Sequence, residues 1–110
     1  MSRSSDDRFS DMLAAIERGL EYRAYLEEEN ALLSGMALDA VLRNLAVIGE
    51  AVRTLPEAEL RSFADVPWAS IAGLRNVIVH EYFRIQPALI VEIVDDELVP
   101  LAAALRGRRS

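Results

Sequence analysis

The chain has 110 residues, a net charge of −6 and no cysteine. This length fits one domain with a modest core, so we expect a single domain over residues 1–110. The missing cysteines exclude disulfides, thiolate zinc sites and cysteine nucleophiles. The acidic balance argues against broad, nonspecific binding to nucleic acid, but it leaves room for a local arginine site. All twelve basic residues are arginines.

Helical periodicity runs through the first half of the chain. Apolar residues recur every three or four positions over residues 6 to about 28, which predicts a helix. The dipeptide Ser34-Gly35 interrupts the pattern. The periodicity returns over residues 36–54 and there is typical of the seam of a helical bundle. The apolar residues of these two stripes are Phe9, Leu13, Ile16, Leu20, Leu38, Val41, Leu45, Ile48, Val52 and Leu55.

The second half predicts one short helix and two long ones. A Thr-Leu-Pro-Glu sequence resembles a capping box at the start of a short helix over residues 54–63. The third long helix begins within Asp-Val-Pro-Trp and covers residues 65–81, and Pro87 opens the fourth, which Pro100 should kink. The inward residues of the fourth helix are expected to be Leu89, Ile90, Ile93, Val94, Leu98, Leu101 and Leu105.

These elements together predict an all-α protein. Because alternation with period two is nowhere sustained, strands are not expected. The architecture we predict is an antiparallel four-helix bundle with one additional short helix. The apolar fraction of 52% is high for so short a chain, so a partner is expected to cover part of that surface. We find neither a signal peptide nor an apolar stretch of about 18 residues, and therefore expect a cytoplasmic protein without a membrane segment.

One segment, LRNVIVHEYF at residues 74–83, places reactive side chains inside an apolar run. On a helix, Asn76 and His80 are four residues apart and share a face. Arg75 is five residues from His80 and therefore lies roughly 140° around the helix. The two converge only if Arg75 reaches around, if the helix loosens near His80, or if a two-fold dimer brings two sets together. Tyr82 lies at or beyond the helix end, where it could be accessible.

Each of these residues also has a structural interpretation. A lone histidine after three β-branched residues, as at His80, is often a hydrogen-bonded core residue. Asn76 could be a buried side chain that caps local backbone. Glu50 could pair with Arg75 or could simply face water, and Gly49 is expected to permit close helix packing.

The residues also resemble a known family. Arg75, His80 and Tyr82 are spaced as in the RX4HXY signature of HepT-like toxins, in the HEPN superfamily of small helical nucleotide-associated domains. The core RNVIVH matches the broader RNxxxH form of the HEPN ribonuclease motif. NLAVIGEAV at 44–52 resembles the second-helix signature of the family, and VPWASIAGLRN at 66–76 resembles the segment that leads into the motif. The resemblance covers roughly residues 7 to 105.

The resemblance implies a fold, an activity and two partners. HepT-like proteins are homodimers whose two motifs line a shared cleft, and they act as metal-independent endoribonucleases on tRNA or mRNA without a cofactor. By this resemblance Arg75 and His80 form the catalytic pair, with Asn76 and Glu50 in support. The family is the toxin of a HEPN/MNT toxin-antitoxin system. Its MntA-like nucleotidyltransferase antitoxin transfers AMP to the motif tyrosine, here Tyr82.

Three hypotheses about function follow from the sequence. The first is a toxin ribonuclease, in which substitution of His80 or Arg75 abolishes RNA cleavage. The second is a noncatalytic HEPN module that binds a nucleotidyltransferase and is modified by it at Tyr82. The third is a structural helical domain, in which substitutions in the motif act only through stability. The acidic net charge weighs mildly against the first hypothesis.

Overall fold

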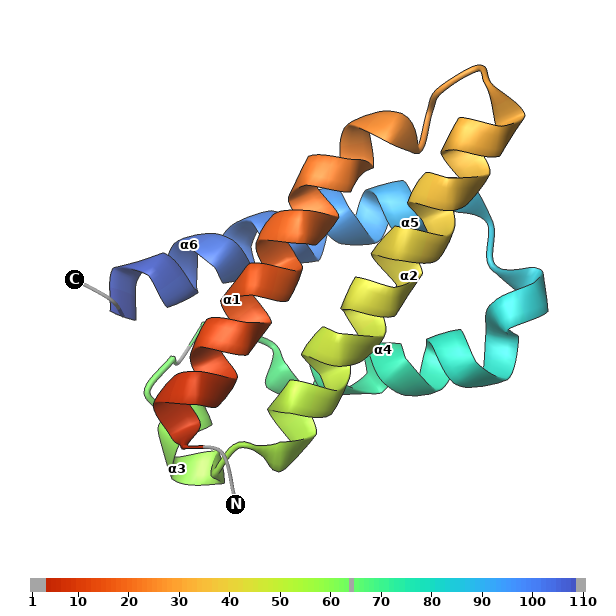
Figure 1. Cartoon of the computed structure of the whole chain (residues 1–110). Coiled ribbons are helices and arrows are strands. Elements are labelled where there is room, and N and C mark those ends of the chain that lie inside the picture. The colour runs from red at the N-terminus through yellow and green to blue at the C-terminus, as the bar shows by residue number, and fades with distance from the viewer. Residues whose placement is uncertain (1–3, 64, 109–110) are drawn as a thin grey trace.

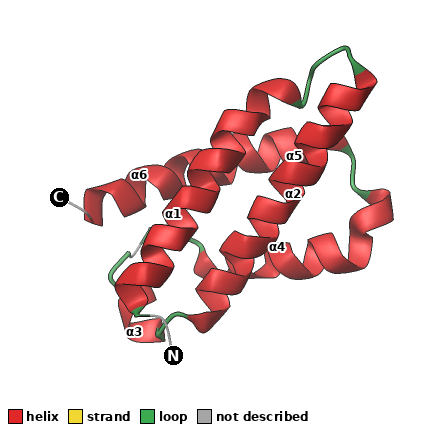
Figure 2. Ribbon diagram, in the orientation of Figure 1, coloured by secondary structure: helices red, strands yellow, loops and turns green. Residues whose placement is uncertain are grey.

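The computed structural model describes residues 4–63 and 65–108, and these ranges contain helices and loops without a strand (Figure 2). This confirms the all-α class. The elements in chain order are α1 (Ser5–Tyr22), the 3₁₀ turn η1 (Arg23–Tyr25), α2 (Ala31–Thr54), α3 (Glu57–Leu60), α4 (Trp68–Glu81), the 3₁₀ turn η2 (Tyr82–Arg84), α5 (Pro87–Ile93), the π-helical turn η3 (Val94–Leu98) and α6 (Val99–Arg108).

Helix α2 is the centre of the arrangement. It forms an antiparallel pair with α1 and also packs against α4, which crosses it at a slant (Figure 1). The arm made of α5, η3 and α6 lies behind α1 in this view and packs against it. The long helices thus share one core, while the strictly antiparallel bundle remains an expectation from the sequence.

The predicted apolar stripes supply most of this core. The buried members are Phe9, Leu13, Ile16, Val41, Leu45, Ile48, Val52, Leu55, Ile90, Val94, Leu98, Leu101 and Leu105. Three predicted members, Leu20, Leu38 and Ile93, are half-buried. The prediction for Leu89 is wrong, because its side chain is 43% exposed. Leu89 precedes the buried Ile90 by one position, which is about 100° around a helix, and therefore faces outward.

The boundary between the first two helices differs from the prediction. Helix α1 ends at Tyr22 and continues only as η1, whereas α2 begins at Ala31 and runs straight through Ser34 and Gly35. The start is fixed by Asn30, whose Oδ1 accepts a hydrogen bond from the backbone N–H of Leu33 at 3.0 Å. Glycine inside a helix costs only about 1 kcal/mol, so the cap outweighs it and the helix is not interrupted.

The predicted capping box does not form. The hydroxyl of Thr54 donates to the carbonyl of Ala51 within α2 at 2.9 Å, and α3 begins after Pro56 without a side-chain cap. Helix α4 does begin within the predicted segment, at Trp68. The indole N–H of Trp68 donates to the carbonyl of Leu60 at 2.7 Å, which ties the start of α4 to α3.

The fourth predicted helix is divided by a π-helical turn. Pro87 occupies the first turn of α5, as predicted. Pro100 has no N–H to bond the carbonyl four residues earlier, and its ring crowds that carbonyl. The wider π-helical turn η3 lies immediately before it and accommodates the irregularity. Leu98 at the end of this turn and Leu101 and Leu105 beyond it remain buried.

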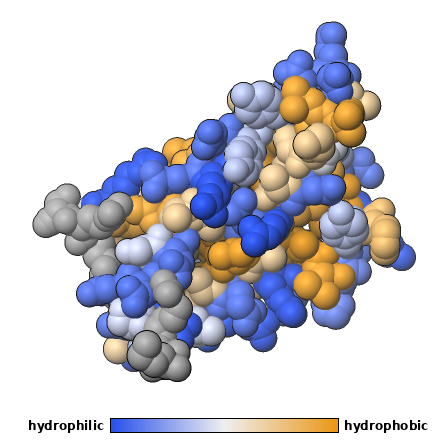
Figure 3. All heavy atoms as spheres, viewed as in Figure 1, coloured by the Kyte–Doolittle hydropathy of each residue, from blue (hydrophilic) through white to orange (hydrophobic). Residues whose placement is uncertain are grey.

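By length and composition alone, α2 could cross a membrane, which the sequence prediction did not anticipate. The core helix of a soluble protein passes the same test, and α2 buries Val41, Leu45 and Ile48 in the core. Apolar side chains also remain exposed at its start, where Leu32 and Met36 are 74% and 61% accessible. Apolar atoms gather over this end of the molecule in Figure 3.

Candidate active site

The position of Arg75 is set by the close approach of α2 to α4 at Gly49. A β-carbon built on Gly49 would lie 3.0 Å from Cβ of Arg75 and 3.1 Å from its backbone nitrogen. A larger residue would force α4 to give way by a few tenths of an ångström, so glycine permits this close contact, which confirms the expected close packing. The side chain of Arg75 then runs along α2, where its Nε lies 3.9 Å from Oε2 of Glu50. Both side chains are substantially exposed, so the pair contributes little energy and leaves the guanidinium available to another anion.

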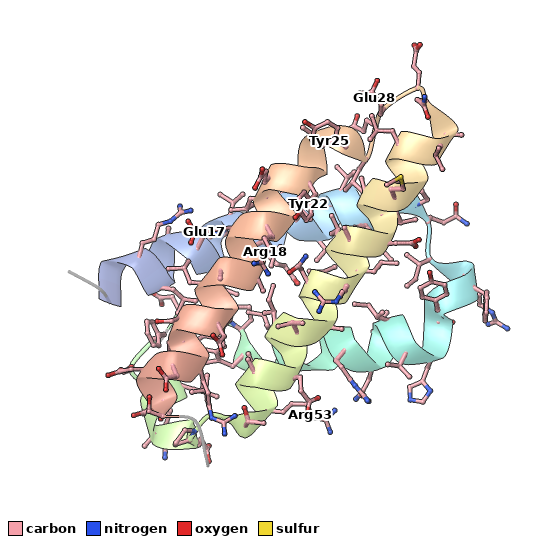
Figure 4. All side chains as sticks on the ribbon, viewed as in Figure 1. Glu17, Arg18, Tyr22, Tyr25, Glu28 and Arg53 are labelled. Carbon is pink, nitrogen blue, oxygen red and sulfur yellow. The ribbon has the colours of Figure 1, made fainter. Side chains whose placement is uncertain are left out.

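Asn76 is exposed and contacts α2 in the next turn. Its Oδ1 accepts a hydrogen bond from Nη1 of Arg53 at 3.2 Å. Arg53 projects from the C-terminal part of α2 (Figure 4). The interpretation of Asn76 as a buried cap is therefore wrong. Because the bond uses the oxygen, the amide NH₂ of Asn76 remains a donor that can point toward a ligand.

His80 faces solvent. Its side chain is exposed, and in the part of the chain that the structure describes its imidazole makes no hydrogen bond or ion pair. The interpretation as a hydrogen-bonded core histidine does not fit this position. Helix α4 extends through His80 to Glu81, where the backbone leaves helical geometry at φ −118° and ψ 15°, so the helix loosens only in the residue after His80. Arg75 lies against Glu50 of α2, and among the described residues no hydrogen bond joins its side chain to His80, so the two do not converge within one chain.

Tyr82 lies just beyond α4, in η2, and is 46% exposed, as the sequence predicted. Its phenol O–H donates a hydrogen bond to Oδ1 of Asp39 on α2 at 3.0 Å. This bond, together with the negative charge of Asp39, raises the pKa of Tyr82 above its ordinary value. Asp39 thus stabilises the protonated phenol, and the hydrogen bond ties the ring to α2.

The sequence analysis missed Asp39 and Arg53, the two side chains of α2 that bond to the motif. They belong to one stripe of α2, in which Asp39, Arg43, Glu50 and Arg53 recur at spacings that share a helix face. Three of the four contact the motif segment, and Arg43 makes no ion pair among the described residues. A polar stripe opposite the buried stripe of a core helix was the signal that could have identified them.

Metal chemistry has no obvious site here. Over the described ranges, no three His, Cys, Asp or Glu side chains are grouped so that they could hold a metal ion. The chemistry that the site offers is that of one imidazole, several guanidiniums, an amide and a phenol. An imidazole can act as a general acid or base, and guanidiniums and an amide NH₂ can bind phosphate.

Comparison with known proteins decides the family. A family profile described as "Ribonuclease HepT-like" matches residues 12–107, most of the chain. The chain belongs to the HepT-like ribonuclease family.

Two relatives match this HepT-like chain over most of both sequences. A protein of Thermococcus cleftensis named "Probable ribonuclease HepT" is 30% identical over 101 residues, which cover 92% of each chain. A protein of Methanocaldococcus jannaschii, named as a candidate RNase, is 32% identical over 88 residues, covering 80% of this chain and 81% of the relative. No solved structure matches.

Family membership confirms the resemblance drawn from the motif, and the ribonuclease family is shared with relatives named as RNases. In this HepT-like chain the motif occupies the solvent-facing side of α4 and the adjoining turn η2. Side chains of α2 contact three members of the motif: Glu50 pairs with Arg75, Arg53 bonds to Asn76 and Asp39 bonds to Tyr82. The fourth member, His80, has no such partner among the described residues.

Proposed function

We propose that the protein is the toxin of a HEPN/MNT toxin-antitoxin system, a metal-independent endoribonuclease that acts on tRNA or mRNA in the cytoplasm. The observation that carries this proposal is that the same exposed motif holds an imidazole, that of His80, which has no partner among the described residues, and a guanidinium, that of Arg75, which is only weakly paired. Membership of the HepT-like ribonuclease family supports it. The net charge of −6 does not contradict it, because Arg43, Arg53 and Arg75 stand on the face that carries the motif, beside the two acids Asp39 and Glu50, and supply cations there.

The proposed chemistry uses the 2′-hydroxyl of the RNA as the nucleophile. An imidazole removes its proton, the 2′-oxygen attacks the adjacent phosphorus, and the bond to the 5′-oxygen breaks as that oxygen takes up a proton. Arg75 stabilises the charge that develops on the phosphate oxygens, and the amide NH₂ of Asn76 donates to the same group. Glu50 keeps Arg75 in place until the phosphate replaces it.

A homodimer completes the site in this proposal. One chain offers a single imidazole, and Arg75 and His80 of that chain point to different sides of α4. A two-fold axis close to α4 would bring the His80 of one copy toward the Arg75 of the other and would supply both a base and an acid. Val77 and Val79, 44% and 52% exposed beside His80, offer apolar surface for this contact.

Tyr82 is the proposed site of control. An MntA-like nucleotidyltransferase antitoxin would join AMP to its phenol oxygen, with release of pyrophosphate from ATP. The exposure of Tyr82 supports its access to such an enzyme. The added phosphate would place a negative charge and a bulky nucleotide beside the cations that bind RNA, and cleavage would stop.

The test is RNA cleavage in EDTA by the unmodified protein. Mass spectrometry first establishes that Tyr82 carries no AMP, and total tRNA and an mRNA are then incubated with the protein. We expect His80→Ala to lower the rate by about 10²- to 10⁴-fold, the usual contribution of a general acid or base. Arg75→Ala should lower it by about 10²- to 10³-fold. Arg61→Ala, which removes an exposed arginine outside the motif, is the matched control and should leave the rate unchanged.

Equal cleavage by wild type and His80→Ala would reject this site. Absence of cleavage by any form, combined with complex formation and AMP transfer to Tyr82, would favour the second candidate, the noncatalytic partner module. That candidate is supported by the half-exposed phenol of Tyr82, which is accessible in the isolated chain. A loss of folding that parallels every loss of activity would favour the structural domain.

A further inference from the structure

Phe83 is the most exposed large apolar residue of the described chain, at 98% accessibility. It follows Tyr82 in η2, and the two rings meet edge to face, with centroids 5.5 Å apart and planes at 87°. The rings therefore form a corner, with one face of Phe83 open to solvent next to the motif. Single exposed apolar residues are common on protein surfaces, so it is the position of this ring beside the motif, and not its exposure alone, that points to a ligand.

The segment that carries Phe83 is held on both sides. Before it, Tyr82 is tied to α2 by the hydrogen bond to Asp39. After it, the half-buried Ile85 packs against the core, and α5 begins at Pro87. The exposure of Phe83 is therefore imposed by the fold, and the ring is presented at a fixed place.

The surroundings of Phe83 are charged, which narrows the choice of ligand. Arg84 is exposed and lies 3.9 Å from Glu81, a weak pair, while His80 has no partner in the described part of the chain. The central area of a protein–protein interface is depleted of Glu, Asp and Lys, and Glu81 stands two residues before Phe83. A single-stranded nucleic acid, in contrast, alternates flat rings with phosphates, and proteins bind it with aromatic rings set among cations.

We infer that Phe83 is a stacking platform for one unpaired nucleobase of the RNA, next to the phosphate that His80 and Arg75 handle. This inference rests on the proposed ribonuclease function and specifies its substrate: the nucleotide beside the cut is single-stranded, because a base inside a duplex has no free face. Asp39 is a positioning residue here, since it holds Tyr82 and Tyr82 supports the ring of Phe83. Stacking is tolerant of base identity, so the platform selects for strandedness rather than sequence.

Binding can be measured without cleavage, which separates this inference from the proposed function. The probe is a fluorescently labelled single-stranded RNA whose 2′-hydroxyls are methylated, so that it cannot be cut. Phe83→Ala should raise Kd by about 5- to 150-fold, the usual effect of losing one stacked base, whereas Phe83→Tyr keeps the ring and should stay near wild type. Tyr25→Ala is the matched control, because Tyr25 is 45% exposed and lies in η1, at the loop end of the α1–α2 pair and outside the motif (Figure 4).

Two further measurements distinguish stacking from a general disturbance. The salt dependence of Kd should be the same for Phe83→Ala and wild type, because no phosphate contact is lost. Abasic nucleotides placed one by one along the probe should weaken wild type at one position, and Phe83→Ala should be insensitive at that position.

An unchanged Kd for Phe83→Ala would overturn the inference while leaving the proposed function intact. A change of oligomeric state in Phe83→Ala, seen by sedimentation, would overturn it in favour of a contact between copies of the chain. If wild type binds no single-stranded probe even at low salt, the inference and the proposed function fail together.

Discussion

Replacing Gly49 with alanine tests the contact that positions Arg75. The new β-carbon would lie 3.0 Å from Cβ of Arg75, 3.1 Å from its backbone nitrogen and 3.3 Å from the carbonyl oxygen of Ile71. Because two of these atoms belong to the backbone, α4 must shift as a unit. Overpacking of this kind costs about 1–3 kcal/mol. The exchange of glycine for alanine inside a helix returns about 1 kcal/mol, so the expected net loss of stability is about 0–2 kcal/mol.

The control is Gly35→Ala on the same helix. Nothing lies within 4 Å of a β-carbon there, so only the gain in helix propensity of about 0.5–1 kcal/mol is expected. The two variants should therefore differ by about 1–3 kcal/mol in the free energy of unfolding by urea, at equal m values. RNA cleavage should fall in Gly49→Ala and not in Gly35→Ala. Equal stabilisation by both substitutions would refute the close approach of α4 to α2.

Two other predictions concern side chains that bond across elements. Asp39→Asn should lower the pKa of Tyr82 toward its ordinary value of about 10, as measured by absorbance of the phenolate. Because the pKa of Tyr82 is raised in the folded protein, the hydrogen bond stabilises the fold below about pH 10, and this stabilisation is lost as the pH rises through the raised pKa. Wild type should therefore lose more stability than Asp39→Asn in that alkaline range. Equal losses in the two proteins would contradict the bond. Trp68→Phe removes the hydrogen bond to the carbonyl of Leu60 and should lower the free energy of unfolding by about 1–2 kcal/mol, measured by urea unfolding followed by circular dichroism. An unchanged free energy of unfolding would show that this bond does not hold α3 against α4.

Local signals in the sequence were sufficient for most helix positions. Pro87 and Trp68 mark helix starts by local chemistry, and the apolar stripes of α1 and α2 follow from their own spacing. The predicted break at Ser34-Gly35 was wrong because these two weak helix formers follow a helix start at Asn30, whose side chain caps α2 four residues before Ser34.

The motif could be found from the sequence, but its supports could not. Spacing along one helix places Asn76 and His80 on a face, and the family signature picks out Arg75 and Tyr82. The partner of Tyr82 is 43 residues away and that of Asn76 is 23 residues away, so both depend on how α2 and η2 or α4 meet in space. Periodicity within one helix carries no information about such a crossing.

In the proposed function the phenol oxygen of Tyr82 is the attachment point for AMP, and its hydrogen bond to Asp39 would give that modification a second effect. Any group joined to that oxygen replaces the hydrogen that Asp39 accepts, so modification and anchoring exclude each other. A modified Tyr82 would leave a carboxylate without its donor and would face it with a second negative charge if the group were a phosphate. The turn of residues 82–84 would then lose its fastening to α2. Modification of Tyr82 would then act in two ways: the attached group would cover the RNA-binding surface, and the loss of the hydrogen bond to Asp39 would free the turn of residues 82–84 from α2.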